Sequence, residues 1–160
     1  MILVTELERD NIEKWYLPMV DLQQLAVTMA VEKVKAEHIE GLRALSARFE
    51  KLIKTQDEPL PILKADKDFH SYILDIAENE YVKDFCNVLW IHIQRLEYSF
   101  FKDSPSLKLS VEEHEKIISA LEFKDGFTAS IRMKEHWDRT VLELYNLGQT
   151  AEAPAEKEFQ

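Results

Sequence analysis

The chain has 160 residues and carries 30 acidic against 20 basic side chains, a formal net charge of −10 at pH 7. Hydrophobic residues make up 46% of it and charged residues 31%, which excludes a chain that is disordered throughout and fits one globular domain. The acidity makes it a poor nucleic-acid binder on its own, because such binding depends on lysine and arginine displacing counterions from phosphates.

The rarer residues exclude further classes of protein. With 3 glycines and 5 prolines the chain has too few turn residues for a many-stranded β fold, and it contains no glycine-rich phosphate-binding loop. Its 1 cysteine, Cys86, cannot form an intramolecular disulfide. No apolar run approaches the roughly 18 residues of a membrane span, and no signal peptide is recognisable. We therefore expect a cytoplasmic protein with no membrane partner.

Helical periodicity predicts the elements in chain order. Residues 2–17 carry charged and apolar patches that Pro18 is expected to interrupt, because proline lacks a donor and clashes with the preceding turn. A new apolar stripe begins at Met19. Further helices are predicted over 39–53, 63–77 and about 80–102.

The last two helices have sequence signals at their starts. Ser110 and Glu113 form an S-x-x-E pattern that predicts a capping box opening the fifth helix. Asp125 and Gly126 break the chain before the sixth, whose stripe runs from Ala129 to Leu147. Such helices, joined by short loops, can bury their stripes only against each other. The predicted fold is an all-α antiparallel bundle of about six to seven helices over residues 1–148, followed by a disordered tail over 149–160.

Four polar residues interrupt the apolar stripes of three of these helices. Asp66 and His70 are one turn apart on the third helix, His114 lies on the fifth and His136 on the sixth. Burying a lone carboxylate is costly, and a buried imidazole needs partners for both nitrogens. Convergence on one divalent metal ion in a central pocket explains all four, and such a ligand set suits Zn²⁺ first, with Ni²⁺, Mn²⁺ or Fe²⁺ as alternatives.

A metal-free explanation of the same residues stays open. The histidines can be hydrogen-bonded core residues, and Asp66 can pair with Lys64 or Lys67 at the surface. His92 falls in a series of four histidines 22 residues apart, but the flanking residues share nothing, so this period is treated as coincidence. His92 is expected to line the core or a pocket rather than to bind a metal.

A set of short motifs resembles a known family. The motifs are Asp66 to His70, Ala77-Glu-Asn79, Glu113-His114 and Ala129-x-x-x-Met133-x-x-His136. Together they are similar to the effector-binding FCD domain of GntR-type transcription regulators of the FadR subfamily, over about residues 12–146. The resemblance implies that Asp66, His70, His114 and His136 hold the metal, and that the metal helps to bind a small carboxylate effector. It also implies a homodimer that meets DNA only through an attached winged helix-turn-helix.

The chain departs from that family in three places. We expect no winged helix-turn-helix in it, which agrees with its acidity. Leu17-Pro18 stands where the family often has Leu-Glu, and Glu78 stands where it usually has glycine. The chain can therefore be an excised domain, a truncated product or a free-standing sensor.

Three further residues are candidates for effector contacts. Arg95 is in helical phase with Val88, His92 and Ser99, so it is expected to point inward and bind a carboxylate in bidentate fashion. The alternative is a surface arginine paired with an acidic neighbour. His92 and Asn79 complete this set, although Asn79 also suits a helix cap.

The leading hypothesis is a metabolite-sensing regulatory domain and not an enzyme. Two alternatives remain, a hydrolase-like metalloenzyme and a metal-free helical interaction module. A metal with open positions could activate water, but no separate base is firmly placed nearby. Di-iron carboxylate bundles are excluded because the chain has no E-x-x-H motif.

Overall fold

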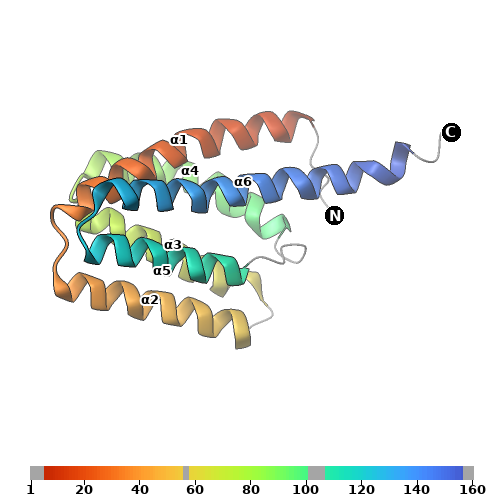
Figure 1. The fold of residues 1–160 in the computed structure, drawn as a ribbon. Helices are drawn as coiled ribbons and strands as arrows, with labels where there is room; N and C mark the ends of the chain where they lie inside the picture. The colour runs from red at the N-terminus through yellow and green to blue at the C-terminus, as the bar shows by residue number, and fades with distance from the viewer. Residues whose placement is uncertain (1–5, 56–57, 101–106, 157–160) are drawn as a thin grey trace.

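The computed structural model describes residues 6–55, 58–100 and 107–156, and this part of the chain forms six helices and no strand. The helices pack side by side as a bundle (Figure 1). The all-α bundle expected from the sequence is therefore confirmed. The helices are α1 (Glu6–Val31), α2 (Ala36–Thr55), α3 (Pro59–Ala77), α4 (Glu80–Phe100), α5 (Leu107–Glu122) and α6 (Gly126–Glu156).

The long helices α1 and α6 pack along each other, and α1 also contacts α3 and α4. On the other side of the bundle α2 packs against α3 and α5, while α5 packs against α6. This arrangement places α3, α5 and α6 around a shared interior. None of the described helices combines the length and the apolar character that a membrane span requires.

The predicted interruption at Pro18 is wrong, because α1 runs through this residue without a break. Proline inside a helix costs a backbone hydrogen bond and crowds the preceding turn. Here the neighbouring Tyr16 and Met19 are fully buried, and the buried stripe continues past Pro18, which is itself exposed. Burial of this stripe against the other helices offsets the local cost of the proline.

The turn between α3 and α4 is built by two consecutive residues. Glu78 ends α3 in the left-handed conformation, with φ 55° and ψ 36°, and its N–H donates to the carbonyl of Asp75. Asn79 then caps α4, because its side-chain oxygen accepts hydrogen bonds from the N–H groups of Tyr81 and Val82, each at 3.1 Å.

The last two helices differ from their predicted bounds. α5 begins at Leu107, so Ser110 lies inside it and does not open it. The predicted capping box is therefore wrong, and the Ser110 hydroxyl instead accepts a hydrogen bond from Arg139. α6 continues to Glu156, through most of the segment expected as a tail. The end of the helix predicted over about 80–102 and the last four residues of the chain lie outside the described residues.

Candidate metal centre

Three helices bring the four predicted metal ligands together in the bundle interior. α3 supplies Asp66 and His70, α5 supplies His114 and α6 supplies His136. His70 and His114 have no exposed surface, and His136 is 4% exposed. One oxygen or nitrogen from each of the four lies within 4.8 Å of the others. Residues up to 70 positions apart in the chain thus converge as the sequence predicted.

The side-chain oxygen and nitrogen atoms of the four residues face one another. Asp66 Oδ1 lies 3.1 Å from His114 Nε2 and 3.6 Å from His70 Nε2. His70 Nε2 lies 3.2 Å from His136 Nε2. All three imidazole rings therefore direct Nε2 toward a common region, as ligands of one ion do.

Several atoms of the cluster have no hydrogen-bond partner. Asp66 Oδ1 and both ring nitrogens of His114 are buried and unpaired among the described residues, as is His70 Nδ1. The 3.1 Å contact between Asp66 and His114 is close, but it lacks the angular geometry of a hydrogen bond. Buried polar atoms are normally paired, because leaving one unpaired costs about 1–3 kcal/mol. An ion bound among the four side chains would satisfy Asp66 Oδ1 and His114 Nε2, whereas the Nδ1 atoms of His70 and His114 lie on the other side of their rings.

The protonation states of the cluster are those that a metal requires. Burial alone would raise the pKa of Asp66, but His70 and His114 outweigh it and hold this pKa well below its ordinary value. Burial lowers the pKa of His70, and it lowers that of His114 to about 4 despite the opposing effect of Asp66. At neutral pH the carboxylate is therefore ionised and both imidazoles are neutral, so neither must lose a proton to bind a metal.

The spacing also fits a metal ion closely. Ligand atoms at about 2.0–2.2 Å from one ion can be at most about 4.4 Å apart. The widest separation in the cluster is bounded at 4.8 Å, so side-chain shifts of a few tenths of an ångström would suffice. The donor set, three imidazoles and one carboxylate, thus fits a divalent transition metal.

A second layer of polar residues fixes the ring of His136 from behind. Glu113 Oε1 lies 2.8 Å from His136 Nδ1, so the carboxylate accepts the Nδ1 proton and leaves the Nε2 lone pair free. Arg139 holds Glu113 in turn, with Nε donating to both carboxylate oxygens at 2.9 and 2.8 Å. The same guanidinium donates to Ser110 Oγ at 2.7 Å and to Glu143 at 3.0 Å.

This layer was not predicted from the sequence. The S-x-x-E pattern predicted a capping box for Glu113, and no role was predicted for Arg139. The available signal was spacing, since Arg139 follows His136 by three positions and so lies on the same side of α6. Burial would raise the pKa of Glu113, but the hydrogen bonds from His136 and Arg139 outweigh it and lower this pKa.

Aromatic rings cover the cluster. Phe69 stacks on His114 with ring centroids 4.0 Å apart, and Trp90 and Trp137 lie 5.6 and 5.3 Å from the ring of His70. These apolar surroundings strengthen electrostatic interactions inside the cluster, and the 22% exposed side chain of Asp66 marks its side nearest to solvent.

The three residues predicted to bind an effector lie elsewhere. His92 is exposed and stacks on Trp15 with ring centroids 5.0 Å apart, while Asn79 caps α4. Arg95 is also exposed, because the buried residues Ile93 and Leu96 define the inner face of this part of α4. The predicted inward orientation of Arg95 is wrong, and the structure brings none of the three into the buried cluster.

Residues 19–139 match the FCD domain family. The chain belongs to this family. The FCD domain is a regulatory and non-enzymatic domain, in agreement with the expectation that the chain is not an enzyme. The prediction of its family from short motifs is thereby confirmed.

Individual relatives agree with this assignment. The chain is 22% identical over 138 residues to the uncharacterized HTH-type transcriptional regulator YdhC of Bacillus subtilis (strain 168), covering 84% of this chain and 60% of that protein. It therefore spans about 60% of the length of this curated relative.

Two solved structures share the fold. E. coli McbR/YncC superposes with a TM-score of 0.77 at 18% identity, covering 89% of this chain and 70% of the other. A GntR family transcriptional regulator from Pseudomonas syringae pv. tomato str. DC3000 gives a TM-score of 0.76 at 15% identity, covering 92% and 60%.

Proposed function

We propose that this FCD domain senses a metabolite for a GntR-type transcription regulator of the FadR subfamily. It binds one divalent metal ion through Asp66, His70, His114 and His136, and a small carboxylate effector beside the ion. The observation that carries the proposal is the set of buried, unpaired atoms that face one another in the cluster. Zinc is the first candidate ion, with nickel, manganese and iron as alternatives.

Four protein ligands leave coordination positions that an effector can use. The bound ion would act as a Lewis acid that coordinates carboxylate oxygens. The residues of the chain prepare this site, since Glu113 orients His136 and aromatic rings pack against His70. An effector then shifts the balance between arrangements of the regulator only as far as its affinity for them differs.

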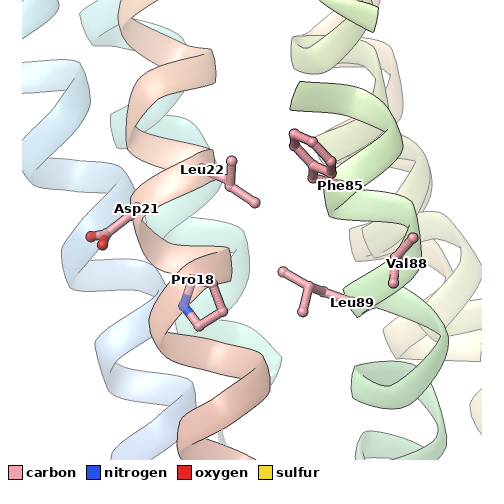
Figure 2. Close-up of a pocket in the computed structure, with 6 residues that line it drawn as sticks. All are labelled: Pro18, Asp21, Leu22, Phe85, Val88 and Leu89. Atoms are coloured by element: carbon pink, nitrogen blue, oxygen red, sulfur yellow. The ribbon is translucent and has the colours of Figure 1, made fainter. Parts of the chain in front are cut away.

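We further propose that the domain forms a homodimer through the outer face of α1 and α4. Figure 2 shows a shallow pocket on this face with Pro18 and Leu22 from α1 opposite Phe85, Val88 and Leu89 from α4. Phe85 and Val88 are 58% and 60% exposed, which is unusual for clustered apolar side chains. In this proposal DNA is bound by a winged helix-turn-helix elsewhere in the regulator, and the protein is cytoplasmic.

The metal proposal is tested by analysing purified protein for bound metal and by thermal unfolding. We expect close to one divalent ion per chain. Small carboxylates should raise the melting temperature of the metal-loaded chain by several degrees, since a ligand at a hundred times its Kd stabilises by about 2.7 kcal/mol. The shift should disappear after EDTA treatment. A metal-free chain that cannot be loaded, or a shift that survives EDTA, would contradict the proposal.

A further inference from the structure

A tryptophan next to the cluster carries an unpaired hydrogen-bond donor. Trp137 follows His136 on α6, and its side chain is buried, with 3% of the residue exposed. The indole Nε1 is buried and has no hydrogen-bond partner among the described residues. Buried donors are normally paired, so this N–H is expected to serve a group that the chain itself does not supply.

Ring contacts place the indole beside two of the proposed metal ligands. The ring centroid of Trp137 lies 5.3 Å from that of His70 and 6.2 Å from that of His136. These two imidazoles stack on each other with centroids 5.1 Å apart, and their Nε2 atoms lie 3.2 Å from one another. The indole therefore packs against both of the imidazoles whose Nε2 atoms face the proposed ion.

A metal ion cannot satisfy this donor. An ion binds lone pairs, whereas an indole nitrogen donates a proton and accepts nothing. The Nδ1 atoms of His70 and His114 also lack partners, but they lie across their rings from the Nε2 atoms that face the cluster. The indole N–H of Trp137 therefore remains as a donor for a molecule that binds the ion.

The arginines considered for this role make other contacts. The Arg139 guanidinium lies behind His136, where it donates to Glu113 and Ser110, and Arg95 is exposed on α4. The indole N–H thus takes the place of the arginine that the sequence predicted for binding a carboxylate.

The ring of Trp90 is the alternative partner of this N–H. Trp90 and Trp137 meet edge to face, with ring planes at 88° and centroids 5.4 Å apart. A contact between an N–H and an aromatic face is weaker than a hydrogen bond to a charged oxygen. A carboxylate within reach would therefore displace it.

We propose that Trp137 Nε1 donates a hydrogen bond to one carboxylate oxygen of the effector while the other oxygen of that carboxylate binds the metal ion. This inference rests on the proposed function and names the residue that recognises the carboxylate. The bound oxygen would lie about 2.0–2.2 Å from the ion, and the free oxygen would accept the indole proton at about 2.9 Å.

The first test measures anion binding to the zinc-loaded chain by titration calorimetry. Formate and acetate are the probes, because the smallest carboxylates need the least room among the packed rings. Trp137→Phe keeps an aromatic ring and removes the N–H, so both anions should bind at least about tenfold more weakly. Zinc affinity, measured with a chromophoric chelator, should be retained.

Trp90→Phe is the matched control. This residue is also buried, at 2% exposed, and its ring centroid lies 5.6 Å from that of His70. The substitution removes the same atoms at a similar distance from the cluster, so it should leave the affinity for formate within about threefold. Equal losses in the two variants would assign the effect to ring packing and overturn the role of the N–H.

The second test needs no variant. In the unmodified zinc-loaded chain, labelled with ¹⁵N, formate should move the indole proton signal of Trp137 downfield, because hydrogen bonding to a charged oxygen deshields the proton. The signals of Trp15 and Trp90 should move less, and EDTA should abolish the effect.

The outcomes separate this inference from the proposed function. If the loaded chain binds formate but the Trp137 signal does not move, or if Trp137→Phe binds it as tightly, the role of Trp137 is overturned while the metal and effector proposal stands. If the loaded chain binds neither anion, the proposed function is contradicted and this inference is overturned with it.

Discussion

The two sides of the His136 ring differ in how completely their polar atoms are paired. On the outer side, Nδ1 meets Glu113, and Arg139 binds both oxygens of that carboxylate. On the inner side, Nε2 faces His70 Nε2, and the neighbouring Asp66 and His114 carry unpaired buried atoms.

This difference supports the proposal that the outer side positions the His136 ring and that the inner side binds a ligand. A paired network holds its members in place and needs nothing more. An unpaired buried cluster is destabilising unless something binds it. The unpaired atoms lie where α3, α5 and α6 meet, which is where we propose that the metal ion binds.

Removing a ligand from the inner side should have the largest effect. In His114→Ala we expect zinc affinity to fall by more than about 100-fold, because outer-layer partners alone are worth about 10–100-fold. Competition with a chromophoric chelator measures this. His38→Ala, which changes a histidine near the start of α2, is the matched control and should keep its affinity. Unchanged zinc affinity in His114→Ala would remove this residue from the proposed site.

A substitution on the outer side should lower zinc affinity less than the loss of an inner-side residue does. Glu113→Gln keeps an acceptor for His136 Nδ1 but loses the charge that Arg139 binds. We expect zinc affinity to fall by about tenfold. The adjacent and exposed Glu112→Gln should not change it. A loss as large as that of His114→Ala would mean that Glu113 is itself a ligand.

The hydroxyl of Tyr16 on α1 donates a hydrogen bond to Glu97 Oε1 on α4 at 3.1 Å. This Tyr16–Glu97 pair predicts how stability depends on pH in the metal-free chain. Burial raises the pKa of Glu97 from 4.5 to about 8, with Asp66 and Glu143 adding to the shift and the hydrogen bond from Tyr16 opposing it. The folded state therefore keeps a proton that the unfolded chain releases. This contribution to stability is full below about pH 4.5 and is lost as pH rises to about 8.

Glu97→Gln should remove this loss of stability at higher pH. Between pH 5 and pH 9 we expect the melting temperature of the variant to gain a few degrees relative to the unmodified chain. Thermal unfolding followed by circular dichroism measures it, with Asp84→Asn as the control. A constant difference across this range would show that Glu97 is already ionised at pH 5.

The fold and the convergence of the four proposed ligands could be predicted from the sequence because both depend on periodicity. A polar residue inside an apolar stripe must lie in the interior, whatever the crossing angles of the helices. Asp66 and His70 are one turn apart, so their shared face followed directly. The motifs around His114 and His136 supplied the remaining two predicted ligands.

The rest required three-dimensional contacts. Ser110 matched a capping pattern, but packing of α5 against α6 gave its hydroxyl to Arg139. Helical phase alone placed Arg95 inward, whereas the rotation of α4 in the bundle buries Ile93 and Leu96 instead. Pro18 shows that tertiary burial can outweigh a local helix-breaking preference, and local sequence carries no measure of that burial.

The smallest predicted effect concerns the end of the helix that carries two inner ligands. Glu78 adopts φ 55°, a conformation that costs a residue with a side chain about 1–2 kcal/mol and glycine almost nothing. Glu78→Gly should therefore stabilise the chain by about 1 kcal/mol and raise its melting temperature by roughly 2–4 °C. The lost ion pair with Lys33, at 3.6 Å and largely exposed, should matter little.

Glu78→Ala loses the same ion pair without relieving the backbone, so it should give no gain. Zinc affinity should be unchanged in both variants, because Asp66 lies three turns away in a well-packed part of α3. Equal stabilisation by alanine and glycine would show that charge, rather than backbone conformation, limits stability at this turn.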